Sequence, residues 1–218
     1  MSSIYSLTTW IIPLLLCMIV HEFAHGFAAL KLGDRTALEE GRLTLNPLPH
    51  IDLMGSIIFP LMLWSMHSPF LIGWAKPVPV NFGKLDHPKR DMGLVAVAGP
   101  FSNLLLAIFF VICGRIVSEL LPESTLRGWF MENISNGVSL SLVIGIFNLL
   151  PILPLDGGRI LVSLLPIEYA IKYQRTEKYG FFVLIGVVLL SQVSGIDIIG
   201  WFIGTLWPFF AGIVSWFM

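Results

Sequence analysis

Residues 4–32 read IYSLTTWIIPLLLCMIVHEFAHGFAALKL, a long apolar run that carries His21, Glu22 and His25 in its second half. At a helical rise of 1.5 Å per residue, the run is long enough to cross a hydrocarbon core of roughly 30 Å. Ionisable side chains are costly to bury in such a helix, so their presence indicates a function. The run therefore predicts a membrane-spanning helix that carries functional side chains.

The composition of all 218 residues supports the same class of protein. Hydrophobic residues make up 56% and charged residues 12% of the chain, whereas a soluble domain carries roughly 25% charged residues. This excludes an ordinary soluble enzyme, a disordered chain and a coiled coil. The formal net charge is −1 and no basic block is present, so nucleic acid is not an expected partner. We predict an all-α polytopic membrane protein of about five to six transmembrane helices, with residues 1–218 as a single domain.

The remaining apolar runs are Ile51–Trp74, Gly93–Cys113, Val138–Leu165, Phe181–Val193 and Ile198–Met218. The run 51–74 is interrupted at residues 64–69, so it forms either a re-entrant hairpin or a full span. Short β segments are expected at 42–46 and 78–81, with ordinary loops as the alternative. No Lys or Arg precedes the first run, and that run exceeds the length of a signal peptide, so we expect no cleaved signal.

Positive residues predict the orientation in the membrane. Seven Lys and Arg residues lie in 31–90 and three in 166–178, but only two lie in 114–136. We therefore expect the first two segments in the cytoplasm, and the third segment and the N-terminus outside, which favours the hairpin for 51–74. His21 follows Ile4 by 17 residues, about 25 Å of helix, so a site there opens toward the cytoplasm.

The spacing of His21 and His25 places both imidazoles on one helix face, where they can bind one metal ion. Glu22 is then placed to act as a general base on a water molecule. Catalytic metal sites use a third protein ligand, and Asp156 is the only carboxylate between Glu132 and Glu168. The alternative is that Asp156 caps a helix that begins at Gly157, and one side chain can do both.

These residues resemble the site-2 protease family of intramembrane zinc metalloproteases, peptidase family M50. The resemblance rests on His21-Glu22-x-x-His25 and on Asn148-x-x-Pro151-x-x-x-x-Asp156-Gly157, in this order. Further similarity lies in Gly41-Arg-Leu-Thr-Leu-Asn46, Gly73-Trp-Ala-Lys-Pro-Val-Pro-Val80 and Gly99-Pro-Phe-Ser-Asn103. The chain looks like the small prokaryotic branch without PDZ or cystathionine-synthase-type (CBS) domains.

The resemblance implies one Zn²⁺ per chain, with His21, His25 and Asp156 as ligands and Glu22 as the catalytic residue. It also implies cleavage of the transmembrane segments of other proteins in a bacterial or archaeal plasma membrane. Asn148 and Asn103 are candidates to bind the oxyanion or the substrate backbone. For Asn103, an interhelical hydrogen bond is the alternative.

Two other classes of function compete with an intramembrane endopeptidase. A metal-ion transporter would also place His and Asp residues inside the membrane. A catalytically inactive relative would bind membrane proteins without cleaving them. The presence of Glu22 beside the first ligand argues against both alternatives.

Overall fold

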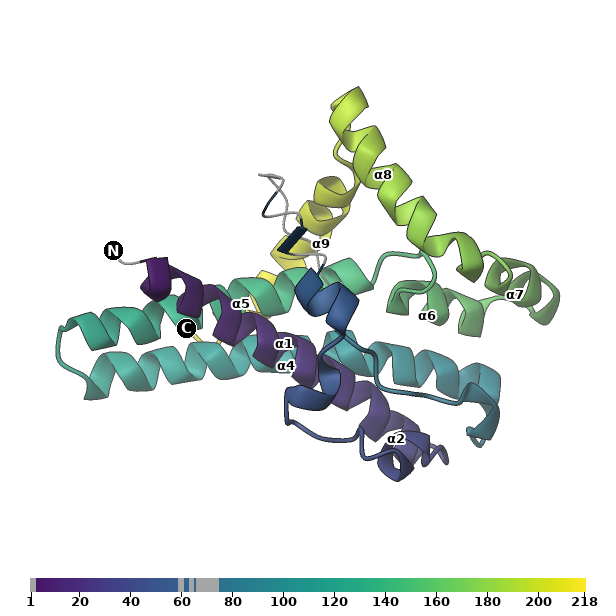
Figure 1. Ribbon diagram of the computed structural model, residues 1–218, viewed down its shortest axis with the longest axis horizontal. Helices are drawn as coiled ribbons and strands as arrows, with labels where there is room; N and C mark the ends of the chain where they lie inside the picture. Colours follow the sequence, from purple (N-terminus) through teal and green to yellow (C-terminus); the bar gives the residue numbers. More distant parts are fainter. Residues whose placement is uncertain (1–2, 59–60, 63–64, 66–74) are drawn as a thin grey trace.

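The computed structural model describes residues 3–58, 61, 62, 65 and 75–218 (Figure 1). Helices dominate the fold, and no strand occurs among these residues. The elements are, in order, α1 (Ser3–Lys31), α2 (Thr36–Glu39), η1 (Leu48–His50), η2 (Leu53–Ile58), η3 (Phe82–Lys84), α4 (Pro88–Leu120), α5 (Thr125–Asn148), α6 (Asp156–Leu164), α7 (Ile167–Gln174), η4 (Glu177–Tyr179), α8 (Gly180–Ser194) and α9 (Ile198–Ser215).

Helices α1, α4 and α5 pack against one another and form the centre of the molecule (Figure 1). Cys17 of α1 meets Leu106 and Phe110 of α4 in one buried cluster between them. Helix α6 packs against α4, and α9 lies against α5 and α4. Helix α1, the carrier of the two candidate histidines, thus packs against both α4 and α5.

Four of the described helices are long and apolar enough to cross a membrane: α1, α4, α5 and α9. Large apolar side chains on their surfaces are exposed, such as Trp10, Phe101 and Phe209, as expected for helices in lipid. The prediction of an all-α, multi-pass membrane protein is confirmed. Helix α8, over the run expected at 181–193, has 15 residues, about 22 Å, and is shorter than a typical span.

The count of five to six spans stays a prediction. Much of the run 51–74 (residues 59–60, 63–64 and 66–74) lies outside the described residues, so the choice between hairpin and span lies outside them too.

The boundaries of two runs differ from the expected ones. Most of the segment 114–136, expected as a connection, is helical, because α4 continues to Leu120 and α5 begins at Thr125. Ser124 caps α5 by accepting a hydrogen bond from the amide of Arg127 at 3.2 Å. Helix α4 has 33 residues, about 50 Å, and therefore extends past a core of roughly 30 Å and carries its charged residues outside it.

The two expected β segments are irregular in the structure. Residues 42–46 and 78–81 form no ladder. Instead, the guanidinium of Arg42 donates to the carbonyl oxygens of Lys76 and Pro77, at 3.1 and 3.2 Å. Pro77 and Pro79 have no amide hydrogen to donate, which explains why this stretch does not pair as a strand.

Both termini lie at the end of the bundle where α4 connects to α5 (Figure 1). The indole of Trp129, early in α5, donates to Thr8 Oγ1 of α1 at 3.0 Å. Near the other terminus, Arg115 of α4 donates to the carbonyl oxygen of Phe217 at 3.5 Å. The histidines of α1 therefore lie away from this end of the bundle.

Candidate metal centre

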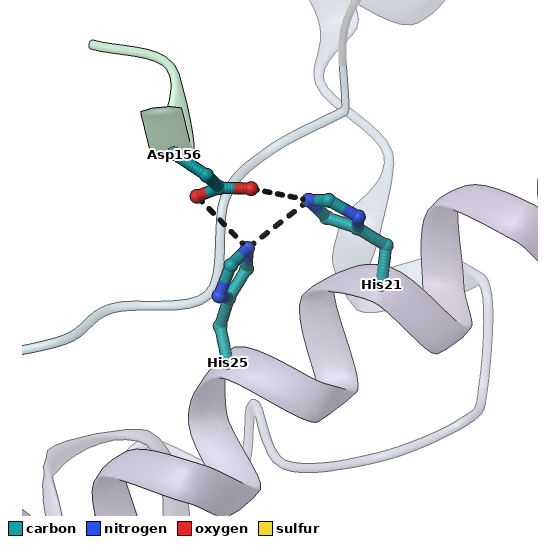
Figure 2. Close-up of side chains that lie close together, drawn as sticks. All are labelled: His21, His25 and Asp156. Atoms are coloured by element: carbon teal, nitrogen blue, oxygen red, sulfur yellow. Dashed lines mark hydrogen bonds and ion pairs between the residues drawn. The ribbon is translucent and has the colours of Figure 1, made fainter. Parts of the chain in front are cut away.

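His21 and His25 lie on successive turns of α1 and point the same way (Figure 2). Their Nε2 atoms are 3.0 Å apart. The side chains are 7% and 12% exposed, so only a small part of each imidazole is accessible to water. The spacing of four residues thus brings the two imidazoles together, as the sequence predicts.

Asp156 reaches the imidazoles from the start of α6, far along the chain (Figure 2). Helix α5 ends at Asn148, and Pro151 and Pro154 prevent it from continuing. The carboxylate oxygens lie 3.1 Å from His21 Nε2 and 3.2 Å from His25 Nε2. The N-cap of α6 is Leu155, so the carboxylate of Asp156 faces the histidines rather than capping the helix.

The three side chains fit a zinc ion. The one nitrogen from each imidazole and an oxygen from the carboxylate all lie within 4.8 Å of one another. Ligand atoms around a tetrahedral zinc ion, each about 2.0–2.1 Å from it, lie roughly 3.3–3.4 Å apart, close to the separations here. Asp156 Oδ2 is buried and has no hydrogen-bond partner, although His21 Nε2 lies 3.1 Å away. A buried carboxylate oxygen without a donor is suited to a cation.

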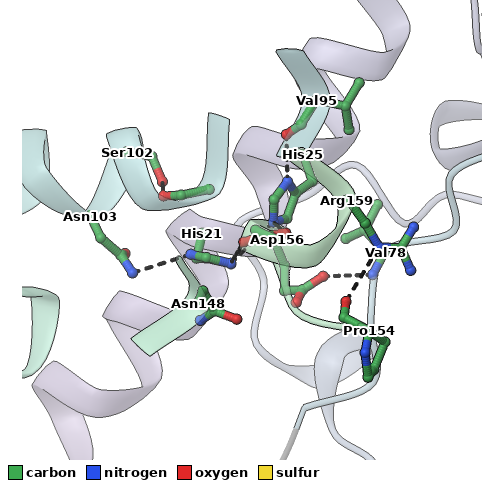
Figure 3. Close-up of polar contacts among 12 residues, drawn as sticks. His21, His25, Val78, Val95, Ser102, Asn103, Asn148, Pro154, Asp156 and Arg159 are labelled. Carbon is green, nitrogen blue, oxygen red and sulfur yellow. Dashed lines mark hydrogen bonds and ion pairs between the residues drawn. The ribbon is translucent and has the colours of Figure 1, made fainter. Parts of the chain in front are cut away.

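Helix α4 supports both histidines from behind (Figure 3). The carbonyl oxygen of Val95 lies 2.7 Å from His25 Nδ1 and can only accept, so this ring donates from Nδ1 and keeps the lone pair on Nε2. Asn103 Nδ2 lies 3.2 Å from His21 Nδ1. Between them, Gly99 leaves no space for a side chain, since a Cβ there would lie 2.4 Å from His25 Nε2.

A cavity of about 350 Å³ opens beside these ligand candidates. Glu22 and Asn148 line it together with His21, His25 and Asp156. Glu22 Oε2 accepts a hydrogen bond from the amide of Val78 at 2.8 Å. The structure thus brings together all the residues predicted for the site except Asn103, which lies behind His21 and does not line the cavity.

The side-chain amide of Asn148 forms a hydrogen bond within its own helix, α5. Its Nδ2 donates to the carbonyl oxygen of Ile144 at 2.9 Å. Arg159 also lines the cavity, and it donates to the carbonyl oxygen of Pro154 at 3.3 Å and to Glu177 at the same distance (Figure 3). Arg159 therefore braces the turn that presents Asp156.

Two contacts to the site come from backbone atoms and were not predicted. They are the amide of Val78 on Glu22 and the carbonyl oxygen of Val95 on His25. Every residue carries such groups, so residue type gives no signal for them. The nearest hint is the pair of prolines around Val78, which leaves its amide as the sole backbone donor of 77–79.

Comparisons with known proteins agree with this geometry. The sequence profile of peptidase family M50 matches residues 125–191, which include Asn148 and Asp156. A Bacillus subtilis protein named "Putative zinc metalloprotease YwhC" is 38% identical over 177 residues, 80% of this chain and 77% of the relative. Proteins named "Putative zinc metalloprotease Rip2" match from Mycolicibacterium smegmatis (26% identity; 86% of this chain, 70% of the relative) and Mycobacterium tuberculosis H37Rv (28%; 92% and 71%). No solved structure matches the chain significantly.

Proposed function

The chain belongs to peptidase family M50, and from that premise we propose that it is an intramembrane zinc endopeptidase. Family membership and the clustered donors imply Zn²⁺ as the cofactor. The observation that carries the proposal is the convergence of His21, His25 and Asp156 beside one cavity that Glu22 also lines. The expected substrates are transmembrane segments of other proteins, cut within or near the bilayer.

His21, His25 and Asp156 are the residues that would hold the ion. They would provide three protein ligands, the number that catalytic zinc sites use, and all three line the cavity. When bound, zinc polarises a carbonyl group and makes a nucleophile from water near neutral pH.

Glu22 is the proposed general base. Its Oε2 is held by the amide of Val78, which leaves Oε1 to take a proton from water and return it to the leaving amine. Val78 is buried and Pro77 and Pro79 flank it, so this support is rigid.

Asn148 is the proposed contact for the substrate backbone. It lines the cavity at the end of α5, and its Oδ1 is the atom left to accept after Nδ2 has bonded to Ile144. A peptide bond in a helix is shielded, so the substrate must unwind before it reaches Asn148. We propose access from the cytoplasm, because Pro77 and Phe82, which line the cavity, belong to the positive segment 31–90, and α6, which carries Asp156, leads into the positive segment 166–178.

The test replaces Glu22 with Gln in the full chain, reconstituted in liposomes with a single-span reporter protein. The Gln carbonyl can still accept from the Val78 amide, so the fold and bound zinc should persist, but an amide cannot take a proton. We expect reporter cleavage to fall at least about 100-fold, with the zinc content unchanged. Cleavage at the wild-type rate would refute Glu22 as the base. Zinc flux into the liposomes without any cleavage, by wild type and variant alike, would show a transporter instead.

A further inference from the structure

Asn103 contacts a proposed zinc ligand but does not reach the cavity. It lies in α4 with no exposed surface, and its amide faces Nδ1 of His21, the ring atom opposite the one that faces Asp156 (Figure 3). Its Oδ1 is buried and has no hydrogen-bond partner. From this position Asn103 cannot touch a substrate, so the oxyanion role considered from the sequence does not suit it.

The polarity of this contact decides what Asn103 does. An imidazole that binds a metal through Nε2 is neutral and carries its proton on Nδ1, where it needs an acceptor. The amide nitrogen now nearest to Nδ1, at 3.2 Å, is a donor. The two ends of an asparagine amide have the same shape, so a half turn about the last side-chain bond exchanges them. That turn gives both the unpaired Oδ1 and the Nδ1–H of His21 a partner.

The other histidine shows the same arrangement with a backbone acceptor. His25 donates from Nδ1 to the carbonyl oxygen of Val95, 2.7 Å away. Val95, Gly99 and Asn103 are spaced by four residues, so they lie on one face of α4. That face of α4 lies against both histidines: it has an acceptor at Val95, a position without a side chain at Gly99, and a second candidate acceptor at Asn103.

We propose that Asn103 is the positioning residue for His21, with Oδ1 accepting from Nδ1–H and so holding the Nε2 lone pair toward the metal. The proposal rests on the zinc protease function proposed above. It makes α4 the support of both histidines: Val95 acts through its backbone and Asn103 through its side chain. Only the second can be removed by mutation.

The experiment measures zinc affinity, by competition with a chelator, for the purified full chain in detergent. Asn103→Leu keeps the size and removes the acceptor, and we expect zinc affinity to fall by about 10- to 100-fold. Asn103→Asp restores an oxygen acceptor and should bind zinc more tightly than the Leu variant. The matched control is Asn133→Leu in α5, another buried asparagine with an unpaired Oδ1, which donates to the carbonyl oxygen of Trp129 far from the site. Its zinc affinity should equal that of wild type.

Wild-type affinity in Asn103→Leu would overturn the proposal, and so would an Asp variant as weak as the Leu variant. A wild-type chain that binds no zinc would instead refute the proposed function. If Asn103→Leu does not fold, a measurement on the wild-type chain still tests the proposal. ¹⁵N NMR of the zinc-loaded wild-type chain should show His21 protonated on Nδ1. His21 bound to zinc through Nδ1 would contradict the assignment.

Discussion

At the scale of single residues, Gly99 gives the two histidines the space that they occupy. A Cβ at this position would lie 2.4 Å from His25 Nε2 and 2.6 Å from His21 Cε1, closer than atoms approach without moving. We expect Gly99→Ala to displace both rings and lower zinc affinity by at least about tenfold, as chelator competition would measure. Gly204→Ala in α9 is the control, because a Cβ added there would meet no atom within 4 Å. Equal zinc affinity in both variants would mean that the rings have more room than the structure gives them.

Asp34 is a residue outside the spanning helices whose charge supports the site indirectly. It is 1% exposed, and its carboxylate accepts from the amide of Thr36 at 3.0 Å and from the amide of Asn81 at 2.6 Å. Burial raises the pKa of Asp34, but these hydrogen bonds, the Thr36 hydroxyl and the charge of Lys84 outweigh it and lower the pKa below its usual value of 3.8. Asp34 thus ties the end of α1 to the segment that carries Val78.

A lowered pKa in the folded state predicts how stability depends on pH. The folded chain binds the proton of Asp34 more weakly than the unfolded chain, so its contribution is complete above about pH 4 and is lost as pH falls through the lowered pKa. We expect Asp34→Asn to cost about 1–2 kcal/mol at pH 7 and less at pH 3, measured as thermal unfolding in detergent. Asp86→Asn, at an exposed carboxylate, should change little at either pH. A difference between Asp34→Asn and wild type that grows toward pH 3 would have the wrong sign.

The residues of the site differ in how far sequence could predict them. His21, Glu22 and His25 lie on one helix, whose geometry fixes their relative positions, and so their spacing predicts their meeting. Asp156 is predicted as the third ligand because it is the only carboxylate between Glu132 and Glu168, and in the structure its carboxylate lies 3.1 and 3.2 Å from the two imidazoles. The place of Asn103 behind His21 depends on how α4 packs against α1, and no local pattern encodes that packing.

At the scale of elements, the segment 75–81 and helix α1 form one unit around Glu22. The amide of Val78 bonds to Glu22, and the Val78 side chain packs against Gly26, one turn further along α1. A Cβ on Gly26 would lie 2.8 Å from Val78 Cγ1, so Gly26→Ala must push Val78 away. We expect reporter cleavage to fall by about tenfold or more while zinc stays bound, because a small displacement of a catalytic group is costly.

A second substitution distinguishes this contact from a general loss of stability. Val78→Ala removes the Cγ1 atom and keeps the backbone amide, so Gly26→Ala with Val78→Ala should recover much of the cleavage. A double variant as inactive as Gly26→Ala alone would show that the Val78 side chain is not the cause.

The elements themselves were predictable where the sequence interrupts a helix. Pro151 and Pro154 end α5 and separate it from α6, as their lack of amide hydrogens requires. The apolar runs 93–113 and 138–165 do not mark the ends of α4 and α5, because charged residues such as Glu119 mark the edge of an apolar run but do not end a helix. A helix that leaves the hydrocarbon can continue in water and carry charges there.

At the scale of the whole molecule, the connection at 121–124, the N-terminus and the C-terminus lie at one end of the bundle, and the site lies toward the other (Figure 1). The described residues contain four candidate membrane-spanning helices, α1, α4, α5 and α9, and an even number of crossings is consistent with both termini at the same end. The charge distribution predicts which end faces the cytoplasm, since 31–90 holds seven Lys and Arg residues and 114–136 holds two.

Labelling with a membrane-impermeant maleimide tests this topology. Glu123→Cys places an exposed thiol at the α4–α5 connection, and Arg175→Cys places one after α7. Cys113→Ala removes the partly exposed native thiol, and Cys17 is fully buried. We expect residue 123 to react in intact cells and residue 175 only after permeabilisation, because positive segments are retained in the cytoplasm. The reverse pattern would place the cavity at the outer face, and reaction of both sites in intact cells would require an additional crossing between α5 and α7.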